Sequence, residues 1–464
     1  FGRAFASVSA GGEFADGRGN AAISVERSEQ DRFSRTSREI GRRYLVSRPN
    51  PNFDPSQPSS EANPQTILEG PGGNHSLSYG GTFNVGTFNP ANPTQRYRFL
   101  PDGSFVRNTY NGWLNANSCI DCEFTDLNAL ADLEPEFDRT SVNAMFNFAL
   151  NDDHNVFAEA KYSKTESHFF GQSAFDQSIR VRPDNAFISP QLAAFIAANP
   201  AALGTVNFST PVPGTPSSYR VLNVNRMNVD AGRRGERIDR DTKRIVVGLE
   251  GFLGEDWTYE TSVNFGESTI SRINLNNRIN ERWHAGLDAV RDPATGNIVC
   301  RATLDPNAIN VHTGQRYNAA LVQGCVPFSI FGDGAVAANP AAAAWFNANS
   351  LNTSKLKQTV YSASVANNAL FSLPAGDVGF AGGIEHRREE SQENTDPLSA
   401  LGLTFLNAIS SRGGRYDVTD VFAETTIPLL ADLPGVERLS LDLAGRYSDY
   451  STIGTTTTWN VGLD

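Results

Sequence analysis

The sequence lacks the long apolar runs of a helical membrane protein. No stretch approaches the roughly 18 continuous apolar residues that a transmembrane helix needs, and 39% of the residues are hydrophobic. This test does not exclude membrane-spanning strands, because only every second residue of such a strand faces lipid. Composition alone therefore leaves a soluble β-rich protein and a membrane barrel as alternatives.

Positive charge is also scarce. The formal net charge is −12 at pH 7, which argues against nucleic acid as a partner, since such proteins usually carry a basic face. Methionine is rare (2 residues) while phenylalanine is abundant (29 residues), a balance that suits strand faces better than helical packing.

Recognisable catalytic and metal-binding motifs are missing too. The six histidines, His75, His154, His168, His284, His312 and His386, show no spacing such as H-E-x-x-H. Asp152-Asp153-His154 lies at an expected hairpin tip, where Asp and Asn commonly form turns. The carboxylates Glu123, Asp126, Asp132, Glu134 and Glu136 could bind calcium, but they lack the fixed loop of an EF-hand. We predict no enzyme activity, no catalytic residue, no cofactor and no metal site.

Cysteine is limited to four residues, all outside the expected strands. Cys119 and Cys122 form C-I-D-C, and Cys300 and Cys325 lie much further along the chain. A Cys-x-x-Cys pair can be redox-active or half of a zinc site. A redox-active pair would need a strand–helix unit of a βαβ fold, which the sequence does not predict. The second cysteine pair is too widely spaced to match the usual pattern of zinc ligands. An oxidising compartment makes two local disulfides, Cys119–Cys122 and Cys300–Cys325, the simpler interpretation, with metal binding as the alternative.

The sequence does contain repeated segments in which apolar and polar residues alternate. In Ser141–Leu150, Val142, Ala144, Phe146 and Phe148 share one face, while Ser141 and Asn147 lie on the other. A turn and a second alternating run follow. The next roughly 75 residues are a polar, Pro- and Asn-rich stretch that is far longer than ordinary loops. Short turns on one side and very long loops on the other are typical of an outer-membrane β-barrel.

This alternating pattern predicts eleven strands, mostly in hairpins around short turns such as Asp16-Gly17. The expected strands are Ala4–Phe14, Gly19–Ser28, Arg139–Leu150, Asn155–Thr165, Thr242–Leu253, Trp257–Ile270, Thr359–Ser372, Asp377–Arg387, Tyr416–Leu429, Arg438–Ser451 and Thr455–Asp464. The long loops are expected at 29–138, 166–241, 271–358 and 389–415. A helix is expected at Ser189–Ala202, with Ser189 as its cap and Pro190 at its first position, and a second at Asn339–Asn349. The pair Asn367–Asn368 breaks the alternation and suggests a bulge.

Charged residues within these strands keep to one face. The expected lumen-facing residues are Glu159, Lys161, Arg244, Glu250, Glu260, Glu385, Arg387, Asp442 and Arg446. A Lys or Arg facing lipid at the bilayer midplane would cost roughly 2–4 kcal/mol, and these strands largely avoid it. Aromatic residues lie near strand ends, at Trp257, Tyr259, Tyr447, Tyr450 and Trp459. A soluble β-sandwich also alternates, but its strands average about 5–6 residues, so we favour a barrel.

Four stretches resemble the barrel region of TonB-dependent outer-membrane receptors, especially a long-loop proteobacterial group. They are Ser9–Asp31, the pair Arg291–Arg301 and Gly324–Gly334, the block Tyr416–Gly454, and the final TTTTWNVGLD. The third is the most specific, because it combines strand, turn and strand. We therefore expect an all-β chain: an antiparallel transmembrane β-barrel fragment of about 11 of 22 strands, spanning 1–464, with long extracellular loops.

The resemblance implies a receptor in the outer membrane of a Gram-negative bacterium. Such receptors bind a scarce nutrient (a siderophore, another metal chelate, cobalamin or an oligosaccharide) and import it with energy that a TonB complex relays through a plug domain. The plug, the TonB-contacting segment and the remaining strands have no counterpart here, so we interpret the chain as an internal fragment of a longer secreted precursor. Expected partners are the TonB complex through the missing plug, a small-molecule ligand and membrane lipid. A passive porin or autotransporter barrel and a non-transport β-rich surface binding protein are the alternatives.

Overall fold

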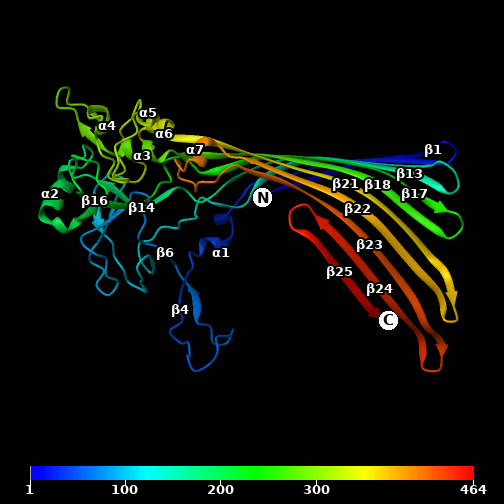
Figure 1. Ribbon diagram of the computed structural model, residues 1–464. Helices are drawn as coiled ribbons and strands as arrows, with labels where there is room; N and C mark the ends of the chain where they lie inside the picture. Colours follow the sequence, from blue (N-terminus) through cyan, green and yellow to red (C-terminus); the bar gives the residue numbers. More distant parts are fainter. Residues whose placement is uncertain (1) are drawn as a thin grey trace.

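One long antiparallel sheet dominates the molecule. The computed structural model describes residues 2–464, and within them eleven strands form a single curved sheet in which each strand pairs with its neighbours along the chain. Most short turns lie at one end of the sheet, and the long connections gather at the other, where the short β24–β25 link also lies (Figure 1). The predicted all-β class and the eleven antiparallel strands are confirmed.

All the strands of this sheet except β25 are longer than the sequence predicts. They are β1 (Arg3–Phe14), β2 (Gly19–Gln30), β12 (Glu136–Ala149), β13 (His154–Phe170), β17 (Gly235–Leu253), β18 (Trp257–Arg278), β21 (Asn347–Leu373), β22 (Gly376–Asn394), β23 (Arg412–Leu433), β24 (Val436–Tyr450) and β25 (Gly454–Leu463). β21 has 27 residues and β18 has 22. The predicted ends toward the long loops were wrong, because the outer parts of these strands carry polar residues on both faces and show no alternation. The long connections are consequently shorter than predicted and comprise residues 31–135, 171–234, 279–346 and 395–411.

The predicted irregularity in β21 is confirmed. The register between β21 and β22 shifts between Asn367 and Phe371. Asn367 is buried, and its Oδ1 accepts a hydrogen bond from the Ala369 N–H (2.8 Å). The bulge thus gives the amide a local partner on an otherwise apolar face.

The two faces of the sheet differ sharply. Directly opposite residues share a face, and one such row runs Phe146, Ala158, Val247, Val263, Tyr361 across five strands. A row on the other face runs Ser141, Ser163, Thr242, Ser268.

Burial on the two faces is the reverse of the pattern in a water-soluble protein. Val247 is 50% exposed and Val421 51%, whereas Asp420 is 2% exposed and Ser141 8%. The apolar face therefore lies open. On the polar face, short side chains such as Ser141 are covered, whereas long charged ones such as Arg244 (49% exposed) and Glu159 (47%) remain accessible.

The apolar band has a defined height. On β18 it runs from Trp257 to Phe265, about nine residues, and Glu267 ends it. Glu267 pairs with Lys243 on β17 and with Lys357 on β21, so a row of alternating charges crosses three strands there. Of the predicted aromatic residues, Tyr259 and Trp459 belong to one row of the apolar face, whereas Tyr450 pairs with Val418 on the polar face.

At the other end, the connections contain many short elements. The first holds β3 (Phe33–Ser34), η1 (Arg35–Ser37), α1 (Glu39–Arg42), β4 (Val46–Pro49), β5 (Thr66–Glu69), β6 (Gly72–Asn74), β7 (Thr82–Asn84), β8 (Arg96–Phe99), β9 (Phe105–Arg107), β10 (Ser118–Ile120) and β11 (Asp132–Glu134). The second holds β14 (Phe175–Val181), α2 (Pro190–Ala198), η2 (Pro200–Ala202), β15 (Leu203–Asn207) and β16 (Ser218–Met227). The third and fourth hold α3 (Asn280–Leu287), β19 (Ala289–Arg291), β20 (Ile298–Cys300), α4 (Arg301–Leu304), α5 (Ala319–Val322), α6 (Pro340–Phe346) and α7 (Pro397–Ala400).

Both predicted helices are present, as α2 and α6. Ser189 caps α2 by accepting the Leu192 N–H, and Asn339 caps α6 by accepting the Ala342 N–H. Within residues 2–464, no helix is long and apolar enough to cross a membrane.

The connections fold together into one body, which we call the cap (residues 31–135, 171–234, 279–346 and 395–411). Strands from its first and second segments share a sheet of order β14-β16-β7-β8-β9. Its core joins Phe83 and Phe99 of the first segment, Leu222 of the second, and Trp283 and Phe346 of the third. The cap is therefore a packed unit with a water-facing surface, not a set of independent loops.

This shared core gives a direct prediction. Phe346 is fully buried and packs edge-on against Trp283 at 5.0 Å between ring centroids. We expect Phe346→Ala to destabilise the cap by about 3–5 kcal/mol and to raise hydrogen exchange in the first and second segments as well as the third. Leu401→Ala, at a side chain that is 71% exposed, is the control. Faster exchange confined to the third segment would show that the segments fold independently.

Candidate functional site

The charged residues expected on the lumen side do share the polar face of the sheet. Arg244 contacts Glu159 (Nη1–Oε2, 3.3 Å) and lies directly opposite Lys161. Arg387 lies 3.5 Å from Glu385, and Arg446 lies 2.9 Å from Asp420. Most positive charges on this face are thus matched by a carboxylate within the sheet.

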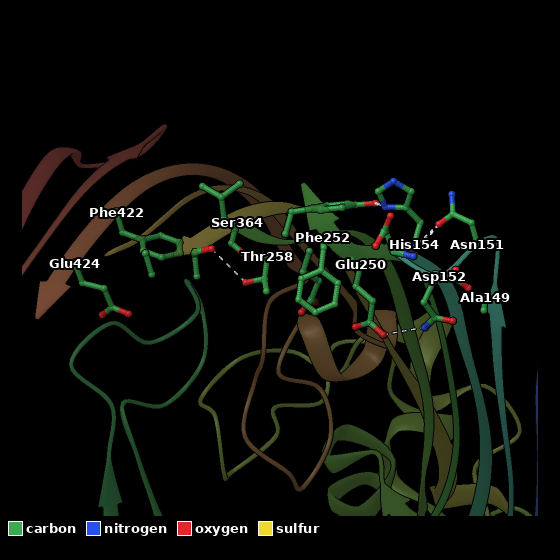
Figure 2. Close-up of a pocket in the computed structure, with 18 residues that line it drawn as sticks. Ala149, Asn151, Asp152, His154, Glu250, Phe252, Thr258, Ser364, Phe422 and Glu424 are labelled. Carbon is green, nitrogen blue, oxygen red and sulfur yellow. Dashed lines mark hydrogen bonds between the residues drawn. The ribbon is translucent and has the colours of Figure 1, made fainter. Parts of the chain in front are cut away.

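Toward the short turns the same face is acidic. Glu250 and Glu260 lie directly opposite each other on β17 and β18, an arrangement that destabilises the pair. With Glu424 they line a shallow cavity of about 640 Å³ (Figure 2). Glu250 accepts a hydrogen bond from Asn155 Nδ2 (2.9 Å). None of these three carboxylates has an ion-pair partner among residues 2–464.

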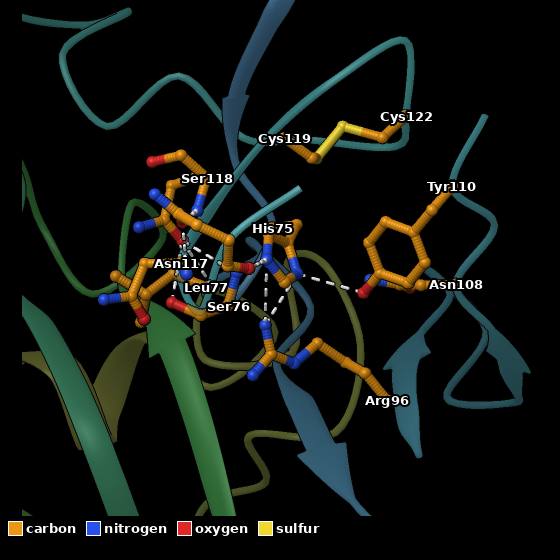
Figure 3. Close-up of a disulfide and its surroundings, with 12 residues drawn as sticks. His75, Ser76, Leu77, Arg96, Asn108, Tyr110, Asn117, Ser118, Cys119 and Cys122 are labelled. Atoms are coloured by element: carbon orange, nitrogen blue, oxygen red, sulfur yellow. Dashed lines mark hydrogen bonds between the residues drawn. A yellow bond between two sulfur atoms is a disulfide. The ribbon is translucent and has the colours of Figure 1, made fainter. Parts of the chain in front are cut away.

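The cap contains a buried polar cluster around His75. Its Nε2 donates to the Asn115 carbonyl (3.0 Å), which leaves Nδ1 to accept from Arg96 Nη1 (2.6 Å) and the Tyr110 hydroxyl (2.9 Å). Figure 3 shows the three side chains converging beside the Cys119–Cys122 disulfide. Burial, with the Arg96 guanidinium nearby, lowers the pKa of His75 to about 4. The histidine is therefore held neutral and acts as a fixed linker between β6 and β8.

A second buried cluster lies between the second and third segments. The rings of His284 and His312 stack at 3.9 Å between centroids. Burial lowers the pKa of His312 to about 3, and burial together with His312 holds the pKa of His284 well below its usual value. Nearby, Arg278 binds Asp176 through two hydrogen bonds of 2.6 Å. The two stacked rings are partly buried and pack beside the core of the cap.

The four cysteines lie in the cap and form two bonded pairs, Cys119–Cys122 and Cys300–Cys325. Their oxidation in the cell stays a prediction. Among residues 2–464, no group of three or more His, Cys, Asp or Glu side chains could hold a metal ion.

The remaining candidates serve the local structure. Asn151 Oδ1 accepts the N–H groups of Asp153 and His154, so that stretch forms a turn. In the first segment, Glu123 pairs with Arg98 and Asp126 with Arg35. Asp132 accepts the Phe170 N–H (2.6 Å) and lies near Arg32; Glu134 and Glu136, in β11 and β12, are exposed. The sequence could not reveal the His75–Arg96–Tyr110 cluster, whose members carry no shared motif.

Comparisons with known proteins place these features in context. No protein-family model matches the chain, and no curated protein matches it. Three solved structures similar to it are the ferric enterobactin receptor PfeA of Pseudomonas aeruginosa (9% identity, TM-score 0.40), the siderophore receptor PiuA of Acinetobacter baumannii (10%, 0.31) and the copper transporter OprC (10%, 0.29). Each match covers 99% of this chain but 38%, 44% and 52% of the respective structure. At these values the likeness establishes neither a family nor a function.

The buried histidines predict an acid-sensitive cap. An unfolded histidine titrates near 6.5, so below that pH the unfolded chain binds protons that folded His75 and His312 refuse. The contribution of these neutral histidines to the stability of the cap is complete above about pH 7. It decreases as the pH falls, until the pH reaches the folded-state pKa values near 4 and 3. We expect a loss of about 2.5 kcal/mol for each histidine at pH 4.5, measured as hydrogen exchange in the cap against pH.

Two variants separate this effect from general acid damage. His75→Gln keeps a donor and an acceptor but does not titrate, so it should flatten part of the pH dependence. His154→Gln, at the opposite end of the sheet, should leave the dependence unchanged. An unaltered acid profile in His75→Gln would contradict the prediction.

Proposed function

We propose that this chain forms part of the barrel wall and the extracellular cap of an outer-membrane receptor that captures a scarce nutrient and imports it with TonB-relayed energy. The observation that carries the proposal is the inverted sheet. Its apolar face is open across eleven strands, while charged residues such as Glu159, Arg244 and Arg446 lie on the opposite, polar face. Lipid on one side and a polar lumen on the other is the environment that matches this distribution.

The energetic argument favours lipid over water. Ile245, Phe265, Tyr361, Ile384 and Val421 each expose about half of their side chain. Covering the exposed half of such a residue is worth about 1 kcal/mol, and monomeric soluble proteins rarely leave so large a contiguous apolar surface open. A membrane covers all of it at once.

The dimensions agree with this assignment. The band from Trp257 to Phe265, about nine residues long, is close to the 9–11 residues of a tilted transmembrane strand. Beyond the charged row at Lys243 and Glu267, β17 and β18 continue for many residues toward the cap. The cap would therefore stand above the outer surface, where a nutrient arrives.

Import requires parts outside this chain. Within residues 2–464 the sheet order runs from β1 to β25 without a pairing between these two strands, so closure needs further strands in the complete receptor. The polar face, with Glu250, Glu260 and Glu424 unpaired, would contact the plug domain on which the TonB complex acts. The chain would contribute binding and gated passage, without covalent catalysis.

A pair of neighbouring substitutions on β18 tests the membrane assignment. Val263 lies on the apolar face and Ser262 on the polar face. We expect Val263→Arg in the full-length receptor to cost roughly 2–4 kcal/mol and to reduce the heat-modifiable, folded fraction in the outer membrane. Ser262→Arg should insert like the unchanged receptor. Equal insertion of both variants, or a receptor that is soluble without detergent, would contradict the assignment.

The transport step needs its own experiment. A strain lacking the complete gene should lose growth on one limiting nutrient from the expected classes, and growth should return with the gene but not in a tonB deletion background. Growth that is restored without TonB would indicate a passive porin. Growth that never depends on the gene would indicate a surface binding protein.

A further inference from the structure

The lysines of this chain are concentrated at one boundary of the sheet. Only Lys161 lies on the polar face, opposite Arg244. The other four of the five lysines lie on the face that carries the apolar band, here called the outer face, in two adjacent rows directly beyond the band: Lys164, Lys243, Lys355 and Lys357. A lysine suits such a boundary, because its four-carbon stem can lie along apolar surface while the ammonium group reaches a polar layer.

The first of these two rows lies at the depth of lipid headgroups in the membrane orientation proposed above. Lys357 is directly opposite Glu267, which is two residues beyond Phe265, the end of the apolar band on β18. Two strand residues extend about 7 Å, and the polar layer on each side of the hydrocarbon core is about 5–8 Å thick. A lipid whose chains cover Phe265 therefore presents its headgroup to Lys357.

A shallow depression of about 310 Å³ lies in this region between β21, β22 and β23. Five of its lining residues pair across the three strands in two adjacent rows and so share the outer face: Lys355, Lys357, Glu390, Gln392 and Arg415. Side chains on this face meet the headgroup layer, so the depression is accessible to a membrane lipid.

The charges of this depression do not cancel. Lys357 and Arg415 are exposed, and neither has an ion-pair partner among residues 2–464. Lys355 is already engaged by Glu267 (Nζ–Oε2, 3.0 Å). Glu390 lies directly opposite both Lys357 and Arg415. Since Lys355 and Glu267 offset each other, two cations remain against one carboxylate, which is a local excess of positive charge on a chain whose net charge is −12.

The surroundings restrict the ligand to an anionic lipid. The next row toward the apolar band adds no net charge, because Arg388 pairs with Asp417 (Nε–Oδ1, 2.7 Å). An ammonium and a guanidinium without partners bind phosphate oxygens through charge-assisted hydrogen bonds. Further down the same strands, Ile384 and Val421 are about half exposed on the outer face, where they can contact acyl chains.

We propose that Lys357 and Arg415 form a binding site for the phosphate of an anionic lipid in the outer leaflet, with the acyl chains of that lipid against the apolar band. The Lys357 ammonium and the Arg415 guanidinium donate hydrogen bonds to phosphate oxygens, and Glu390 limits the affinity by repelling them. The proposal rests on the proposed function only for the membrane position of the sheet, because lipid binding requires neither a nutrient nor TonB.

The test uses the full-length receptor purified in dodecyl maltoside. Dioctanoyl phosphatidic acid, dioctanoyl phosphatidylcholine and inorganic phosphate are titrated by calorimetry. We expect phosphatidic acid to bind about fivefold more tightly than phosphatidylcholine, and more tightly than inorganic phosphate, which cannot contact the apolar band. Equal affinity for the two lipids would show that the anionic headgroup is not recognised. Equal affinity for phosphatidic acid and inorganic phosphate would identify a soluble anion as the ligand. Either result overturns the proposal.

Neighbouring variants locate the binding and guard against misfolding. Lys357→Gln and Arg415→Gln should each weaken phosphatidic acid binding about fivefold. Glu390→Gln, in the same depression, should strengthen it, because this change removes a like charge. Lys161→Gln, on the polar face, is the matched control and should leave binding unchanged. Damage to the fold would weaken binding in every variant of the depression, so opposite effects of Lys357→Gln and Glu390→Gln indicate recognition of charge. Undiminished binding in both Lys357→Gln and Arg415→Gln would refute the site.

The outcomes also separate this proposal from the transport proposal. Selective binding of phosphatidic acid, with no TonB-dependent growth phenotype, would retain the lipid site and remove the import function. TonB-dependent growth, with equal binding of the two lipids, would do the reverse.

Discussion

The structure depends on one constraint: a sheet whose apolar face points outward must have an apolar solvent. Along β17, β18 and β21 the residues Val247, Val263 and Tyr361 form an open apolar row, while Ser141 and Asp420 on the other face are nearly inaccessible. In water, folding would bury the first set and expose the second. Successive side chains of a strand point to opposite faces of the sheet. Once one face contacts lipid, the environment of the residues along all eleven strands is therefore set. The placement of the paired charges on the polar face follows from that choice.

The same chain then builds a second core for a second solvent. Above the charged row of Lys243, Glu267 and Lys357, the strands carry polar residues on both faces. Backbone hydrogen bonds between neighbouring strands hold this part of the sheet together. The connections cannot rely on lipid there, so they bury Phe83, Trp283 and their neighbours against one another. Three segments far apart in sequence contribute to that core. A body of this kind has little freedom to open one segment alone, since each supplies part of the packing of the others.

Sequence reasoning succeeded where one rule applied without interruption. Strict alternation located all eleven strands, and the Ser189-Pro190 and Asn339-Pro340 pairs located α2 and α6. It failed where the rule no longer applies. The outer half of β21, from Asn347 to Gln358, has no apolar face and was taken for a loop. Strands β7 and β8 have three and four residues, and β7 pairs with β16 through Asn225 and Thr82. Pairing between such short and distant segments is decided by the tertiary core, which no local pattern encodes.

The rigidity of the cap bears on how it can recognise a ligand. A mobile loop must be ordered when it binds, and the entropy of ordering reduces the affinity. Around His75 that ordering is already complete: Arg96 and Tyr110 hold the imidazole ring, and the Cys119–Cys122 bond closes the neighbouring turn. A preformed cap above an inverted sheet thus separates recognition, which needs water and rigid polar groups, from passage, which needs the lumen.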